Sequence, residues 1–179
     1  MSKKKIEVAR RYNETAEMYD RRYKTIQFSK YREVFPELEM GNRDLILDIG
    51  GGTGLLLEYF KPQQQNIVIC DLSIEMLKTG KAKHPSGNFI CADSENLPFR
   101  DSCFHITCFF SILQNLESPT SSLQEGTRVL LKNGKIVVTA LSKIFDSDEL
   151  IDHLKDVKCE IEKNWYLHIE DIAVIGTKM

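Results

Sequence analysis

The chain has 179 residues, of which 42% are hydrophobic, and its formal net charge at pH 7 is −2. This length and this apolar content predict a single domain with a well-buried core. No apolar run approaches the roughly 18–20 residues of a membrane-spanning helix, and the lysine-rich start lacks the apolar segment of a signal peptide. We therefore expect a cytoplasmic protein that has no membrane partner.

The net charge hides an asymmetry along the chain. Residues 1–32 hold ten lysines and arginines against four acids, so this segment is basic and the remainder is acidic. A basic lobe attracts an anionic substrate through its long-range field, although a solvated helix face with pairs such as Arg10–Glu14 explains the same pattern. The sequence pI near 6.1 argues against tight nucleic-acid binding by this chain alone.

The chain opens with helical periodicity over residues 4–20 and 27–38, and Gly41 ends this region. We expect residues 1–40 to form a helical cap over the functional site and residues 41–179 to form the core of the same domain. In the cap, aromatic residues alternate with arginines and lysines, and few positions suit a deeply buried core. The cap should therefore be more mobile than the sheet.

The rest of the chain alternates between strand and helix patterns. Strands are expected at residues 45–49, 66–70, 88–91, 103–109, 135–140, 158–165 and 169–178, and helices at 54–60, 74–83, 119–131 and 147–155. No helix separates the last two strands, so they should form an antiparallel hairpin on an otherwise parallel sheet. The order predicts an α/β fold, with a doubly wound, seven-stranded, mostly parallel sheet and helices on both faces.

A glycine-rich turn after the first strand is the most informative feature. The segment from Leu45 to Gly54 begins as an apolar strand and ends in the turn, and a helix pattern follows at once. Glycine tolerates positive φ and lets a ligand lie against the backbone. In an open α/β sheet this turn lies where ligands bind, and the next helix presents unpaired N–H groups to it. The turn therefore indicates a cofactor loop, with a tight turn without ligand as the alternative.

Spacing narrows the type of loop. The dinucleotide fingerprint Gly-x-Gly-x-x-Gly needs a glycine at position 55 or 57, and both positions are leucine. A phosphate-binding P-loop needs a lysine that this stretch lacks. The pattern that remains is Asp-x-Gly-x-Gly-x-Gly, from Asp48 to Gly54.

Two further acids follow the next two strands. Asp71 ends the second strand, where a carboxylate can accept hydrogen bonds from both hydroxyls of a ribose. Asp93 ends the third strand. Each acid alone is explained as a solvated turn residue, but three acids at three successive strand ends predict a nucleoside-containing ligand. Five cysteines without a Cys-x-x-Cys pair, and no histidine at zinc-ligand spacing, predict no metal site.

These residues resemble motif I of the class I S-adenosylmethionine-dependent methyltransferases, which have a Rossmann-like fold. Residues 12–20 resemble the opening helix of the small-molecule and RNA-modifying branch of that family, 71–77 its motif II, 109–116 its motif IV, and 130–138 the turn before its fifth strand. The chain departs from the family at Gln114 and Asn115, where motif IV usually carries one or two histidines.

The resemblance implies S-adenosylmethionine as the cofactor, S-adenosylhomocysteine as its product, and an enzyme that moves the methyl group by in-line displacement. Asp48 and the glycine loop would hold the methionine part, Asp71 the ribose, and Asp93 the adenine edge. The cofactor-binding residues expected from the resemblance are Asp48, Gly50, Gly51, Gly52, Gly54, Asp71, Leu72, Met76, Asp93, Ser94 and Ser111.

The acceptor side is less defined. Tyr12, Tyr19 and Tyr23 could line it, and the sequence identifies no general base. Only residues 141–145 separate the fifth strand from its helix, so the acceptor pocket should be covered by residues 1–40 alone or left open. An open pocket favours a macromolecule or a partner subunit, because a small substrate needs most of its surface enclosed.

Three functions from different classes remain open. A methyltransferase of RNA or protein, working with a small activating subunit, fits the basic start of the chain. A methyltransferase of a small metabolite, alone or as a homodimer, fits the resemblance equally well. A cofactor-binding scaffold without catalysis fits the altered motif IV.

Overall fold

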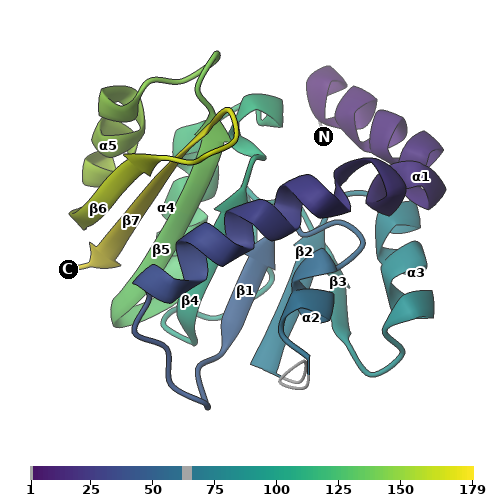
Figure 1. Ribbon diagram of the computed structural model, residues 1–179, viewed down its shortest axis with the longest axis horizontal. Helices are drawn as coiled ribbons and strands as arrows, with labels where there is room; N and C mark the ends of the chain where they lie inside the picture. The colour runs from purple at the N-terminus through teal and green to yellow at the C-terminus, as the bar shows by residue number, and fades with distance from the viewer. Residues whose placement is uncertain (1, 62–65) are drawn as a thin grey trace.

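Seven strands form one sheet in the order β3-β2-β1-β4-β5-β7-β6 (Figure 1). The computed structural model describes residues 2–61 and 66–179. The strands are β1 Ile46–Ile49, β2 Ile67–Asp71, β3 Asn88–Cys91, β4 Phe104–Phe110, β5 Leu130–Leu141, β6 Cys159–Tyr166 and β7 Asp171–Lys178. β1 to β5 pair in parallel, whereas β7 is antiparallel to both β5 and β6. This confirms the predicted mostly parallel sheet with its C-terminal antiparallel hairpin.

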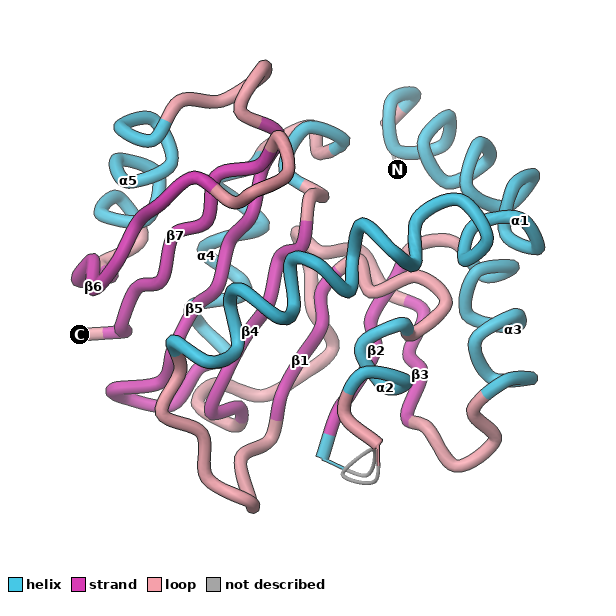
Figure 2. The backbone as a smooth tube through the Cα atoms, viewed as in Figure 1, coloured by secondary structure: helices cyan, strands magenta, loops and turns pink. Residues whose placement is uncertain are grey.

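Helices cover both faces of the sheet, as predicted (Figure 2). The helices are α1 Lys3–Val34, α2 Leu55–Tyr59, α3 Ile74–Lys83, α4 Pro119–Val129 and α5 Ser147–Asp156. On one face, Tyr31, Leu56 and Leu77 from α1, α2 and α3 join one hydrophobic cluster. On the other face, Leu123 of α4 and Leu154 of α5 join a second cluster. The sheet is therefore buried on both sides, as parallel sheets usually are.

α1 is one helix where the sequence predicted two. Ser2 caps it by accepting a hydrogen bond from the backbone N–H of Lys5. No glycine or proline interrupts residues 3–34, so nothing in the backbone ends the helix before Pro36, which lies in a short 3-10 turn at Phe35–Glu37. Figure 1 shows the ribbon of α1 changing direction partway along, so that its two halves cover different parts of the fold.

The C-terminal half of α1 belongs to the core, so the expectation of few deeply buried positions was wrong there. Tyr31 is 3% exposed and Val34 is fully buried. The ring of Tyr31 lies 4.8 Å from that of Phe110 and 5.9 Å from that of Phe35, measured between centroids. Residues three and four apart share one helix face, so Gln27, Tyr31 and Val34 all turn towards the sheet.

Strand β5 begins at Leu130, five residues before the strand expected at 135–140, and α4 ends at Val129 rather than at 131. The polar residues Lys132 to Gly134 read as a turn in the sequence. The sheet accommodates them as an irregularity, because Leu130 pairs with Phe104 and the next pair is Lys135 with Ile106. By contrast, α3 and β3 have the predicted bounds.

Among the described residues, no helix is both long enough and apolar enough to cross a membrane. α1 has 32 residues, but charged side chains recur along its whole length and leave no continuous apolar stretch. The same residues contain no cluster of three or more histidine, cysteine or acidic side chains that could hold a metal ion. The cytoplasmic location expected from the sequence stays a prediction.

A buried ion pair joins α1 to the start of β7. Lys30 Nζ lies 2.8 Å from Asp171 Oδ2, and each side chain is 3% exposed. Ser111 Oγ donates a hydrogen bond to the same carboxylate oxygen at 2.6 Å and also bonds Lys30. Burial lowers the pKa of Lys30, and the charge of Asp171 opposes that shift. Helix α1, the end of β4 and the start of β7 are therefore joined through charged groups that water does not screen.

Removing one charge of this pair tests its contribution to folding. Lys30→Met should lower the free energy of unfolding by about 3–5 kcal/mol, because it leaves Asp171 buried and unpaired. Lys30→Met combined with Asp171→Leu should recover most of that loss, since apolar side chains replace both charges. Urea unfolding measures both variants. Lys24→Met, which breaks the exposed pair with Glu58, should cost under about 1 kcal/mol; an equal cost for Lys24→Met and Lys30→Met would contradict the argument.

Candidate functional site

The glycine loop lies at the carboxyl end of β1, next to the point where the strand order reverses between β1 and β4. The backbone N–H groups of Gly50 and Gly51 donate to the carbonyl oxygen of Cys70 at 2.8 and 3.1 Å, which ties the loop to the end of β2. Gly50 has a φ of 73°. A Cβ at this residue would lie 2.5 Å from the side chain of Ile112, so only glycine fits here.

A first cavity of about 100 Å³ opens beside this loop. The residues predicted for the site that line it are Tyr12, Tyr19, Gly50, Asp71, Leu72, Met76, Asp93, Ser94 and Ser111. The other predicted residues, Tyr23, Asp48, Gly51, Gly52 and Gly54, are not among its lining residues. Parallel strands end at the same edge of a sheet, so side chains far apart in the sequence meet in this cavity.

Asp71 is held in place by backbone donors. The N–H of Gly52 donates to its Oδ2 at 2.9 Å, and the N–H of Ser73 donates to its Oδ1 at 2.8 Å. Burial raises the pKa of Asp71, and these hydrogen bonds oppose the shift. Ser73 also caps α3, accepting a hydrogen bond from the backbone of Met76. Asp71 therefore connects the glycine loop with the tip of β2 and the start of α3.

Asp48 lies beneath the glycine loop instead of facing the first cavity. Its side chain is 2% exposed, and a Cβ at Gly51 would lie 2.6 Å from its Oδ2. Burial raises the pKa of Asp48 to about 8, and the nearby Asp71 carboxylate adds to the shift. Asp48 is therefore largely protonated at neutral pH while the loop has this arrangement.

Asp93 reaches the first cavity but already has partners. Lys5 Nζ lies 2.7 Å from Asp93 Oδ2 and 2.8 Å from Glu95 Oε2. The backbone N–H of Glu95 donates to Asp93 Oδ1 at 3.0 Å. Burial alone would lower the pKa of Lys5, but the two carboxylates outweigh it and raise this pKa. Lys5 lies at the start of α1, whereas Asp93 and Glu95 lie almost ninety residues later in the chain. No local sequence pattern predicts this contact.

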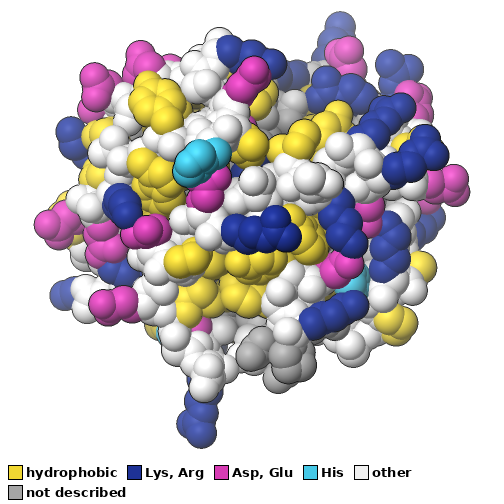
Figure 3. All heavy atoms as spheres, viewed as in Figure 1, with side chains coloured by type: hydrophobic (Ala, Val, Ile, Leu, Met, Phe, Trp, Pro, Cys, Tyr) yellow, Lys and Arg dark blue, Asp and Glu magenta, His cyan; other side chains and the backbone are white. Residues whose placement is uncertain are grey.

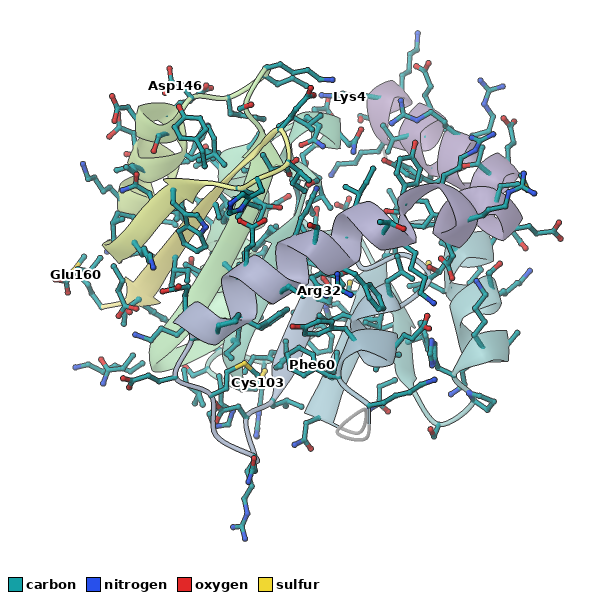
Figure 4. The ribbon with its side chains drawn as sticks, in the orientation of Figure 1. Lys4, Arg32, Phe60, Cys103, Asp146 and Glu160 are labelled. Carbon is teal, nitrogen blue, oxygen red and sulfur yellow. The ribbon has the colours of Figure 1, made fainter. Side chains whose placement is uncertain are left out.

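The start of α1 makes other polar contacts with the loop that follows β4. Figure 4 labels Lys4 at this end of the helix, and its ammonium bonds the backbone carbonyl of Leu116. Arg11 donates to Asn115 Oδ1 at 2.8 Å, and Asn115 Nδ2 donates to the Tyr12 hydroxyl at 3.1 Å. The N-terminal half of α1 therefore covers the cavity through polar bonds, whereas the C-terminal half is held by the core.

Ser111 stands at the boundary between two cavities. Its φ of 55° is uncommon for a residue other than glycine and marks local strain at the end of β4. The second cavity has a volume of about 420 Å³ and lies between α1 and the ends of β4, β5 and β7. Residues that line both cavities are Tyr12, Tyr19, Ser111 and Asn115.

The second cavity has a cationic and amide-rich wall. Tyr23 lines it, as do the charged residues Arg11, Arg22, Lys30 and Asp171 and the amides Gln27, Gln114 and Asn115. All three predicted tyrosines therefore border this cavity. Burial raises the pKa of Tyr12 and Tyr19, so both remain protonated at neutral pH. Sequence reasoning missed Lys30 and Asp171, because these two partners lie far apart in the chain, and it also missed Gln27.

The fold and the site together indicate the class of ligand that the protein binds. An open α/β sheet with a glycine loop at the switch point, and a carboxylate at the tip of the next strand, is the arrangement that binds nucleoside-containing ligands. A family model described as a methyltransferase domain matches residues 47–138. The chain belongs to the class I S-adenosylmethionine-dependent methyltransferase family, which confirms the resemblance seen in the sequence and the class of cofactor that it implied.

Individual relatives agree with this assignment. The chain is 30% identical over 146 residues to a demethylmenaquinone methyltransferase of Paenarthrobacter aurescens, covering 79% of this chain and 58% of that protein. The chain thus spans about three fifths of the length of the first curated relatives that it matches.

Solved structures share the fold. A methyltransferase of Thermotoga maritima superposes with a TM-score of 0.79 at 16% identity, covering 96% of this chain and 100% of that one. A chain from the complex of a Haloferax volcanii methyltransferase with its activator Trm112 superposes with a TM-score of 0.73 at 14% identity, covering 99% and 98%. Both likenesses show the fold alone, so the activating subunit and the homodimer stay predictions for this chain.

The pH dependence of stability tests the burial of Asp48. The pKa of Asp48 is about 8 in the folded chain and about 3.9 in an unfolded chain. The folded state then keeps a proton that the unfolded state releases, so this carboxyl lowers stability as pH rises from about 4 to 8. Asp48→Asn should flatten that fall in urea unfolding measured at several pH values. Asp152→Asn, at an exposed site on α5, should leave it unchanged; a fall of full size in Asp48→Asn would show that another group causes it.

Proposed function

We propose that this chain binds S-adenosylmethionine in the first cavity and transfers its methyl group to an acceptor held in the second. The observation that carries the proposal is the boundary shared by the two cavities at Tyr12, Tyr19, Ser111 and Asn115. Displacement at a sulfonium needs the attacking atom in line with the leaving sulfur, so donor and acceptor must meet at one opening. The cofactor supplies the reactive methyl group, and the protein supplies position and exclusion of water.

The side chains of the first cavity match this cofactor, but its volume of about 100 Å³ lies below the range of small-molecule pockets, so the start of α1 must move outwards when the cofactor binds. A Cβ at Gly52 would lie 2.7 Å from Met76 Cε and 3.9 Å from Asp71 Oδ2, so glycine keeps the space above the carboxylate free. We assign the ribose hydroxyls to Asp71 and the faces of the adenine ring to Leu72 and Met76. Asp93 and the backbone of Ser94 would accept from and donate to the adenine edge once Lys5 withdraws from Asp93.

The methionine part of the cofactor is assigned to Gly50 and Ser111, at the side of the first cavity that meets the second. Asp48, Gly51 and Gly54 would act through the shape of the loop. Gly54 supports this role because it begins α2 in the left-handed conformation. Asp48 would lose its proton when a cationic amino group approaches, because a nearby positive charge favours the carboxylate.

A small molecule is the acceptor that the second cavity favours. Its volume of about 420 Å³ is in the range of small-molecule pockets, and α1 forms one of its walls, which supports the assignment of residues 1–40 as a cap. Basic residues gather over the N-terminal part of α1 (Figure 3). Many basic residues along the whole of α1 already bond other parts of the chain, namely Lys4, Lys5, Arg11, Lys24 and Lys30. These contacts weaken the case for a polyanionic acceptor such as RNA.

Asp71→Ala tests the cofactor assignment. The change removes a charged acceptor for two ribose hydroxyls, each such bond contributing about 1.5–3 kcal/mol. The affinity for S-adenosylhomocysteine, measured by calorimetry, should fall by at least about a hundredfold. Glu75→Ala, at a neighbouring exposed carboxylate, serves as the control and should bind normally. Wild-type affinity in a folded Asp71→Ala variant would overturn the assignment.

Lys5→Ala tests whether the start of α1 competes with the cofactor. Because Lys5 occupies Asp93 and Glu95, binding of the adenine edge must first break these ion pairs. Removing the lysine should raise the affinity for S-adenosylhomocysteine on the order of two- to fivefold, the equivalent of one partly exposed ion pair. Lys4→Ala, next to it, should have no such effect. A lower affinity in Lys5→Ala would show instead that Lys5 contacts the cofactor.

A further inference from the structure

Two residues that line the second cavity, Gln27 and Gln114, each have a buried carbonyl oxygen, Oε1, without a hydrogen-bond partner among the described residues. The residue Gln27 is 8% exposed, so its amide is shielded from bulk water. Buried polar atoms without partners are rare and cost stability. The third such atom in the described chain, Thr107 Oγ1, belongs to β4 and lines neither cavity. Two of the three unpaired atoms in the described chain therefore belong to residues of the second cavity.

The neighbours of each glutamine show which amide atom is free. Gln114 Nε2 donates a hydrogen bond to the carbonyl oxygen of Ser111 at 2.6 Å. Only the amide nitrogen can be the donor, because the amide oxygen carries no hydrogen. The amide of Gln27 hydrogen-bonds the hydroxyl of Tyr19, which leaves Oε1 unpaired. Both glutamines therefore line the second cavity with an unpaired carbonyl oxygen, and a ligand that reaches these oxygens must donate N–H or O–H groups.

The cavity also carries one positive charge without a partner. Lys30 is paired with Asp171, and Arg11 donates to Asn115. Arg22 lines the cavity and is exposed at its mouth, and no ion pair or hydrogen bond engages it within residues 2–61 and 66–179. A guanidinium in this position favours an anionic oxygen group, either carboxylate or phosphate.

The described residues that line the second cavity leave no free general base, since Lys30, their one lysine, is paired with Asp171. Among the residues described there, none is histidine, and burial raises the pKa of Tyr12 and Tyr19. The carboxylate of Asp171 is held by Lys30 and Ser111. The nucleophile must therefore attack without first losing a proton to the protein. An ionised hydroxyl has a lone pair but no proton for the glutamine oxygens, whereas a neutral amine has both, and nearby cations favour the neutral amine.

We propose, resting on the proposed function, that the acceptor is a small amine that also carries an anionic group, and that the second cavity directs methylation to its nitrogen. The anionic group would bind Arg22, and the amine N–H groups would donate to Gln27 and Gln114. The nitrogen lone pair forms the bond to the methyl carbon, and the carbon–sulfur bond breaks with its electron pair left on sulfur. The methylated nitrogen then releases one proton to water.

Transfer of labelled methyl groups identifies the acceptor. Purified protein is incubated with methyl-labelled S-adenosylmethionine and a whole-cell extract, and the products are separated into RNA, protein and small-molecule fractions. The label should enter a small molecule that binds an anion exchanger, and mass spectrometry should locate the new methyl group on nitrogen. Treating the extract with phosphatase beforehand should abolish the product if the anion is a phosphate and leave it unchanged if it is a carboxylate.

Variants then connect that product with the second cavity. Arg22→Gln should raise the KM of the identified acceptor about tenfold with little change in kcat, because one charged bond to the anion is lost. Arg21→Gln provides the matched control, since the neighbouring arginine lines neither cavity. Gln27→Leu and Gln114→Leu should each lower kcat/KM by about tenfold. All four variants should keep wild-type affinity for S-adenosylhomocysteine.

The outcomes separate this inference from the proposed function. Label in RNA or protein, on oxygen or carbon, or in a neutral molecule would overturn the amine inference while leaving a methyltransferase. Label in no fraction, together with normal cofactor binding, would overturn catalysis and leave the scaffold alternative. Absence of cofactor binding would overturn the proposed function itself. An acidic amine methylated equally well by wild type and Arg22→Gln would remove the assigned role of the arginine.

Discussion

The position of α1 depends on the buried ion pair between Lys30 and Asp171. Two charges removed from water need each other, so the helix can cross the sheet only in a register that brings the ammonium to the start of β7. Ser111 joins the pair through its hydroxyl, which also fixes the end of β4. Both cavities border this residue. Their common boundary is therefore set by an interaction between the first helix and the last strand of the chain.

Local signals predicted the sheet and most helices. Ser73 caps α3 and β3 follows as expected, because capping residues and apolar strands act within a few residues. The errors came where polar residues were read as breaks. The polar stretch between the two expected helices of α1 contains no glycine or proline, so the helix continues through it. Residues 132–134, which were predicted to form a turn, lie within β5, where the pairing with β4 shifts its register.

The candidate site was predictable to the extent that it depends on strand ends. Asp71 and Asp93 reach the first cavity because parallel strands finish at one edge. Asp48 comes two residues before its glycine turn and lies beneath it, a difference that depends on packing and leaves no mark in the spacing. Lys5 and Lys30 were not foreseen, since their contacts join distant parts of the chain. Gln27 was not foreseen either, because single lysines and glutamines occur on many solvated helices.

A helix that borders two cavities also makes the binding of ligands in them energetically interdependent. The N-terminal half of α1 holds Asp93 through Lys5, and the same half supplies Arg11 and Tyr12 to the second cavity. A ligand that displaces this half in one cavity changes the arrangement of the other, and thermodynamic reciprocity requires the effect to be equal in both directions. The consequence is that two ligands cannot bind independently, because whichever binds first changes the affinity for the second by the same factor.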